Sequence, residues 1–260
     1  MRLVSKESDA PQEQSAERAA RVDLAAAHRL AVMHGYHEGV CNHLTLTLPG
    51  TTDRFLLIPY GLHWSEVTAS DFMVVDYDGH IISGNGVAEQ TAFCIHAPVH
   101  RRIKKAACVL HTHMPYASAL VRLEDTRLDM VGQTEAGLYD LIAYDDEYTG
   151  IAFDPSEGDR LAEVLGPEKS ILFMAHHGVL VTGETVAQAY DRLYYLERAC
   201  QTQLYALWTG RKLKQIPQPQ LQRTIEQFRN IPYQAGVPPW ETHFAALKRI
   251  LDRKEPDYAA

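Results

Sequence analysis

Short apolar segments bounded by turn residues are the feature that most restricts how this chain can fold. Residues 44–48 alternate between leucine and threonine, a pattern typical of a half-buried strand. Residues 72–76 and 81–83 flank Asp78-Gly79, a dipeptide that favours a tight hairpin turn. A hairpin joins antiparallel strands, whereas a doubly wound fold needs a regular strand–helix–strand alternation that this sequence lacks. We therefore expect a mixed or largely antiparallel sheet.

Helices alternate with further strands along the rest of the chain, which predicts an α/β fold. Residues 185–208 give the clearest helix, because their apolar side chains recur at helical spacing and Thr185 fits the start of a capping box. A helix is also expected over 90–104, where Pro98 favours either a kink or a first turn near Ala97. The other predicted helices cover 15–34, 156–165, 221–229 and 240–252, and the other predicted strands cover 55–58, 106–110 and 171–175.

The chain divides into three parts. Residues 1–15 are predicted to be a flexible N-terminal tail, and residues 16–210 form the main domain. Residues 211–260 are rich in proline in places and are predicted to form an arm with short helices, packed on its own domain or on a neighbouring subunit. Four widely spaced cysteines are expected to be free, buried thiols: Cys41, Cys94, Cys108 and Cys200.

Charge and hydropathy argue against two classes of partner. The formal net charge is -8 and no basic run stands out, so nucleic acid is not expected to bind. No apolar run approaches the roughly 20 residues that cross a bilayer. The N-terminus also lacks the apolar core of a signal peptide. The sequence therefore predicts a cytoplasmic protein without a membrane partner.

Histidines follow two of the predicted strands. His111 and His113 end one strand, and residues two apart on a strand point to the same face, so both imidazoles can reach one ion. His176 and His177 end another strand and could supply a third ligand at the same sheet edge. Three protein ligands with an open position are typical of a catalytic metal site. The alternative is a group of hydrogen-bonded histidines without a metal.

A further pair, His96 and His100, is spaced to share one face of a helix. Helical zinc motifs with this spacing carry a glutamate beside the first histidine, and Ala97 stands there instead. The pair is therefore expected to pack in the core or to support the site rather than to bind the metal.

These motifs resemble the class II aldolase/adducin family, in particular its adducin-like branch. The similarity is densest around His111-Thr112-His113 and extends over roughly residues 16–210. Its other matching stretches are 42–46, 58–61, 68–71, 173–183 and 194–200. The resemblance implies a three-layer α/β/α sandwich around a mostly antiparallel mixed sheet. It also implies a homotetramer with active sites at subunit interfaces.

The same resemblance implies a divalent metal held by His111, His113 and His177. Zinc is the expected metal, with manganese, cobalt or iron as alternatives. Aldolases of the family carry a catalytic glutamate four residues before the histidine that matches His96, and Ala92 occupies that position here.

The catalytic candidates for proton transfer are, in order of preference, Glu89, Tyr116 and His176. Asn42 and Gly61 lie in the stretches that match the family's phosphate-binding segments and are the expected substrate-binding residues. Both stretches differ from the hydroxyl-rich aldolase versions, which argues against a sugar-phosphate substrate.

A metal with an open position acts as a Lewis acid and would stabilise an enolate-type intermediate of an α-keto, α-hydroxy or aromatic hydroxy acid. The sequence therefore favours a metal-dependent carbon–carbon lyase, an aldolase or a decarboxylase, acting on a small carboxylated substrate. Two alternatives stay open: a non-haem iron oxygenase, a branch that the family includes, and a non-catalytic scaffold domain like that of adducin.

Overall fold

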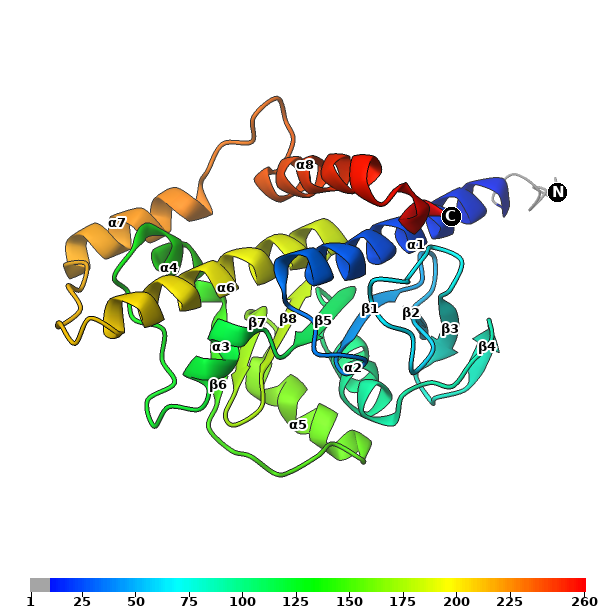
Figure 1. Cartoon of the computed structure of the whole chain (residues 1–260), viewed down its shortest axis with the longest axis horizontal. Coiled ribbons are helices and arrows are strands. Elements are labelled where there is room, and N and C mark those ends of the chain that lie inside the picture. Colours follow the sequence, from blue (N-terminus) through cyan, green and yellow to red (C-terminus); the bar gives the residue numbers. More distant parts are fainter. Residues whose placement is uncertain (1–9) are drawn as a thin grey trace, which may run out of the picture.

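The computed structural model describes residues 10–260, which form three layers with a sheet in the middle (Figure 1). The sheet has eight strands in the order β4-β3-β2-β1-β5-β8-β7-β6. Its strands are β1 His43–Thr47, β2 Arg54–Leu57, β3 Met73–Asp76, β4 Ile81–Ser83, β5 Cys108–Thr112, β6 Ile142–Asp145, β7 Ile171–Met174 and β8 Val179–Gly183. Neighbouring strands are antiparallel except β6 and β7, which run parallel. The predicted α/β/α sandwich with a mostly antiparallel mixed sheet is thus confirmed.

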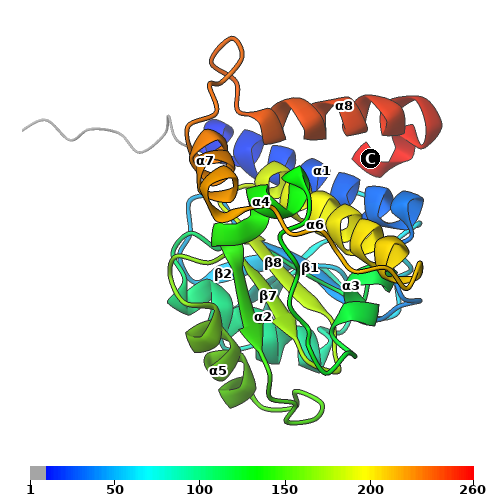
Figure 2. The ribbon, with the colours of Figure 1, turned by 90° about the vertical axis from the view of Figure 1, so that its left-hand side faces the viewer.

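Helices cover both faces of this sheet (Figures 1 and 2). One face carries α1 Ala10–His34 and α6 Val186–Leu207, and the other carries α2 Gln90–Arg102 and α5 Pro155–Leu165. Successive strand residues point to opposite faces, so Leu110 packs in the core beneath α1 and α6 while Val109 packs against α2 and α5. The remaining helical elements are α3 Pro115–Leu120, α4 Gln133–Leu138, η2 Tyr139–Leu141, α7 Gln218–Arg229, α8 Pro239–Lys254 and η3 Pro256–Ala259.

Helix α2 runs through Pro98, so the alternative start near Ala97 is wrong. Proline has no amide hydrogen to give to the carbonyl of Cys94, four residues earlier. Gly158 of α5 packs against that carbonyl so closely that a Cβ there would lie 2.1 Å from the Cys94 oxygen. Gly158 thus allows α5 to approach α2 closely at the carbonyl that Pro98 leaves without an intrahelical hydrogen bond.

The N-terminal end of the described chain differs from the sequence prediction, whereas the C-terminal segment has helices where they were predicted. Helix α1 begins at Ala10 rather than residue 15, so the end of the predicted tail is helical, and residues 1–9 lie outside the described part. Helices α7 and α8 lie where the sequence predicts short helices, at 221–229 and 240–252. Helix α8 lies against α1 and α6, so the arm packs on its own domain (Figure 2). The sequence patterns did not predict β6, β8, α3 or α4.

The cysteines agree with the prediction of buried thiols at three of the four positions. All four cysteines are free, and three are buried, but Cys41 is exposed. In the described residues 10–260, no helix has the length and apolar character needed to span a membrane.

Two buried histidines predict how the fold responds to acid. Burial lowers the pKa of His28 and of His100 from 6.5 to about 4, so both are neutral in the folded chain and become charged on unfolding below pH 6.5. The unfolded state then binds more protons, and stability falls as the pH drops from about 6.5 towards 4. We expect a loss at pH 5 on the order of 2 kcal/mol from each residue.

Urea unfolding at pH 7.5 and pH 5.0, in the presence of a chelator, measures this loss. His28 packs against Trp64 and Phe72, so His28→Phe can keep the packing while removing the titrating group. This variant should lose about 2 kcal/mol less than the wild type on acidification. His80 is exposed, and His80→Gln serves as the control. Equal acid sensitivity of His28→Phe and the wild type would contradict the prediction.

Candidate metal centre

The two histidine-bearing strands end at the same edge of the sheet. Strand β8 lies between β5 and β7 and is antiparallel to both, so β5 and β7 run parallel to each other. Their carboxyl ends therefore meet at one edge. His111 is the fourth residue of β5, His113 follows the strand, and His177 lies in the turn between β7 and β8.

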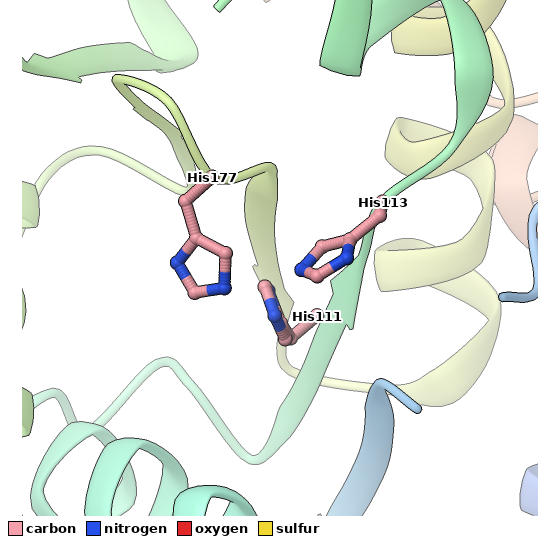
Figure 3. Close-up of side chains that lie close together, drawn as sticks. All are labelled: His111, His113 and His177. Carbon is pink, nitrogen blue, oxygen red and sulfur yellow. The ribbon is translucent and has the colours of Figure 1, made fainter. Parts of the chain in front are cut away.

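These three histidines converge on one point (Figure 3). One nitrogen from each of His111, His113 and His177 lies within 4.8 Å of the others, and in the described residues this is the one group of three or more histidine, cysteine or acidic side chains so arranged. The ring centroids are 4.7 to 5.0 Å apart. The predicted set of metal-ligand candidates thus lies together in space.

Hydrogen bonds orient two of the three rings. Nδ1 of His111 donates to the carbonyl oxygen of Val179 at 3.0 Å, and Nδ1 of His113 donates to the carboxylate of Glu38. Each bond fixes the tautomer in which Nε2 carries a lone pair. Outer partners of this kind, a carbonyl and a carboxylate, are typical of histidines that bind metals.

A buried nitrogen without a partner shows that the residues fit a metal ion. Nε2 of His113 is inaccessible to solvent and makes no hydrogen bond within the described residues. Burial holds the pKa of His111 well below its usual range, and burial lowers the pKa of His177 to about 4. His111 and His177 are therefore neutral at neutral pH, the form in which imidazole binds a metal.

Gly178 lets the turn that carries His177 approach β5. A Cβ at this position would lie 2.6 Å from the carbonyl oxygen of Thr112 and 2.7 Å from Cδ2 of His113. Real side-chain contacts are longer, so only glycine allows the turn to sit here without displacement. Gly178 thus sets the distance between His177 and the other two histidines.

Glu89 lies outside the group of three but is linked to it through His43. Its carboxylate caps α2 by accepting the amide hydrogen of Ala92 at 2.7 Å and pairs with Nε2 of His43 at 3.0 Å. The His43 ring stacks on His111 with centroids 6.0 Å apart. Burial raises the pKa of Glu89, but the hydrogen bonds from His43, Thr91 and Ala92 outweigh it and lower the pKa to about 2.

The other two catalytic candidates make their side-chain contacts outside the trio. The hydroxyl of Tyr116 bonds to the hydroxyl of Tyr205 on α6 at 2.7 Å. His176 has a left-handed backbone with φ of 60°, is exposed, and lines a groove with Arg122 and other residues. Within residues 10–260, no hydrogen bond links either side chain to the three histidines.

The two expected substrate-binding residues have different surroundings. Asn42 is buried, and its Oδ1 accepts the amide hydrogen of His113 at 3.0 Å, so this side chain positions a ligand candidate. Gly61 lies in an exposed turn with φ of 92°, and no hydrogen bond links it to the trio within residues 10–260.

Sequence reasoning did not identify Glu38 as a partner of His113. The two residues are separated by 75 positions, and their contact depends on the loop after α1. No local pattern marks such a contact, since Glu38 reads as an ordinary exposed carboxylate. His43 was also missed. It is two residues from Thr45 on β1, so the two side chains face the same side of the sheet.

Glu38→Gln is expected to weaken zinc binding by 10- to 100-fold, because loss of the carboxylate removes the charge that orients His113. A competition titration against a chromophoric chelator measures the change. Glu66 is a second exposed carboxylate, whose bond to the backbone of His63 has no link to the trio, and Glu66→Gln is the matched control. Equal zinc affinity in Glu38→Gln and Glu66→Gln would show that Glu38 does not support the site.

Comparisons with known proteins agree with the geometry. Residues 22–204 match the family described as class II aldolase and adducin N-terminal domain. A provisionally named class 2 aldolase protein of Caulobacter vibrioides is 34% identical over 94% of this chain and 93% of its own. Rat alpha-adducin is 31% identical over 91% of this chain but only 33% of its own length.

Solved structures share the same architecture. An aldolase II superfamily protein from Pseudomonas syringae matches with a TM-score of 0.86 and 32% identity, over 94% of this chain and 96% of that one. L-fuculose 1-phosphate aldolase from Glaciozyma antarctica matches with a TM-score of 0.81 over 99% and 96% of the two chains, and its 23% identity supports the fold alone. The chain therefore belongs to the class II aldolase and adducin family.

Proposed function

We propose that this protein is a divalent-metal-dependent carbon–carbon lyase whose metal is bound by His111, His113 and His177. The observation that carries the proposal is the convergence of the three rings, with the free Nε2 of His113 buried among them. Zinc is the proposed metal, although imidazole donors also suit iron. A metal with these three protein ligands would act as a Lewis acid on a substrate oxygen.

The substrate that we propose is a small keto, hydroxy or aromatic hydroxy acid without an essential phosphate. The sequence supports this choice, since Asn42-His43-Leu44-Thr45 and Pro59-Tyr60-Gly61 differ from the hydroxyl-rich phosphate-binding stretches of the family's aldolases. Of the three candidates for proton transfer, Glu89 keeps this role in the proposal because its carboxylate reaches the trio through His43. Its low pKa keeps it ionised, as a proton acceptor must be.

An assay panel tests the proposal. Keto and aromatic hydroxy acids are each incubated with the protein and zinc, manganese, cobalt or ferrous iron, and carbon–carbon cleavage is followed. At least one combination of substrate and metal should react, and Glu89→Gln should slow that reaction while zinc affinity is retained. Absence of cleavage with every combination would contradict the proposal that the protein is a lyase.

The same preparations distinguish the alternatives. Oxygen consumption with ferrous iron would favour an iron oxygenase. A protein purified without metal, whose stability is unaffected by chelators, would favour a scaffold role. The homotetramer implied by the resemblance stays a prediction. Sedimentation equilibrium measures the mass of the assembly and so the number of subunits.

A further inference from the structure

A row of polar side chains lies between β1 and α2, in a layer that is otherwise apolar. His43 and Thr45 are two residues apart on β1 and share a face, and His96 and His100 are one helical turn apart on α2. All four are at most 8% exposed. Buried polar groups need partners, so each nitrogen and hydroxyl of this row can be assigned a donor or acceptor role.

The assignment begins at His100. Its Nδ1 donates to the carbonyl oxygen of Ala106 at 2.8 Å, and burial lowers its pKa to about 4, so the neutral ring has no second hydrogen. Nε2 of His100 must accept, and the hydroxyl of Thr45 donates to it at 2.8 Å. That hydroxyl has only one hydrogen, so its contact of 2.7 Å with Nδ1 of His96 makes the His96 nitrogen the donor.

His96 is therefore held in the tautomer with its hydrogen on Nδ1. Burial holds the pKa of His96 well below its usual range, so the ring is neutral and Nε2 carries a lone pair. This nitrogen is buried and has no hydrogen-bond partner in the described part of the chain. An unsatisfied buried acceptor is destabilising, which calls for a ligand that donates a hydrogen bond.

A second unpartnered nitrogen adjoins the first. Nε2 of His43 pairs with Glu89, whereas Nδ1 of His43 is buried and has no partner among the described residues. The rings of His43 and His96 are perpendicular, with centroids 5.6 Å apart. His43 is also the cross-strand partner of His111, and the two rings stack, so the His43 ring lies beside the metal centre.

We infer that His43 and His96 form a binding site for one small hydroxyl group next to the metal centre. A hydroxyl can give its one hydrogen to Nε2 of His96, and a water molecule has a second hydrogen that Nδ1 of His43 can accept. A carboxylate or other anion has no hydrogen to give to His96, and an apolar group would satisfy neither nitrogen. The hydroxyl belongs either to a water molecule or to a hydroxy-acid substrate, and the second source rests on the proposed function.

Nitrogen NMR of histidine-labelled, metal-free protein tests the tautomer that the site requires. We expect the hydrogen of His96 on Nδ1 in the wild type. Thr45→Val removes the hydroxyl and should allow the Nε2–H tautomer to appear, and Thr45→Ser should restore the wild-type spectrum. A wild-type His96 with its hydrogen on Nε2 would overturn the inference whether or not the protein is a lyase, and this result needs no variant.

Crystal structures of the zinc-loaded protein, with and without glycolate, identify the hydroxyl. An oxygen within hydrogen-bonding distance of Nε2 of His96 is expected in each. Water in both structures assigns the site to solvent, whereas replacement of the water by the glycolate hydroxyl assigns it to substrate. In the second case Thr45→Val should weaken glycolate binding about tenfold more than acetate binding. A structure with no oxygen between the two rings would overturn the inference.

Discussion

His177→Ala is expected to weaken zinc binding by more than 100-fold. The variant removes one of three ligands, whereas loss of a residue that only orients a ligand already costs 10- to 100-fold. His177 lies in a turn rather than in a strand, so the sheet should keep its structure. Competition against a chromophoric chelator gives the affinity, and zinc should raise the melting temperature of the wild type but not of the variant.

His176→Ala is the matched control for this prediction. The residue is the neighbour of His177 in the same turn, but its side chain is exposed and lines a separate groove. We expect it to bind zinc like the wild type, within about threefold, because the trio is unchanged. If His176→Ala lost zinc and His177→Ala kept it, the assignment of ligands at this turn would be wrong.

Gly178→Ala is expected to damage the metal centre without changing any ligand. Its Cβ would lie 2.6 Å from the carbonyl oxygen of Thr112, so the turn must move away from β5 and carry His177 with it. Such overpacking costs about 1–3 kcal/mol of stability. We expect zinc affinity to fall at least tenfold, since a ligand displaced by about 1 Å no longer fits the tetrahedral geometry of zinc.

Gly158→Ala is the control that separates damage at the metal centre from a general loss of stability. This Cβ would meet the carbonyl oxygen of Cys94 at 2.1 Å, at the contact between α2 and α5. The variant should lose stability in urea unfolding but bind zinc as tightly as the wild type. Equal losses of zinc affinity in the two glycine variants would mean that Gly178 acts only through overall stability.

The grouping of His111 and His113 with a histidine of the 176–177 pair was predictable because it depends on short-range rules. Residues two apart on a strand share a face, which places His111 and His113 together, and the end of a second buried strand presents His176 and His177 at the sheet edge. The choice of His177 came from the family resemblance. Which of His176 and His177 faces the other two histidines was not predictable in the same way. His176 has a positive φ, which directs it away from its neighbour, and no sequence pattern announces that conformation.

The supporting contacts depend on tertiary packing and could not be predicted from the sequence. Tyr116 follows the second ligand closely in sequence, yet its hydroxyl bonds to Tyr205, 89 positions later. Strand β8 was missed because its apolar residues directly follow His176 and His177, which were predicted only to end the preceding strand. The helix over residues 90–104 was predicted with either a kink at Pro98 or a first turn near Ala97, because Gly158, which packs against Pro98, lies on another helix.

One diffraction experiment tests the central claim most directly. Crystals of the zinc-loaded protein are measured just above and just below the zinc absorption edge. We predict a single anomalous peak per chain at about 2.0–2.1 Å from one ring nitrogen of each of His111, His113 and His177. A zinc-loaded crystal with no peak at these three nitrogens, or with its peak at other residues, would contradict the metal centre.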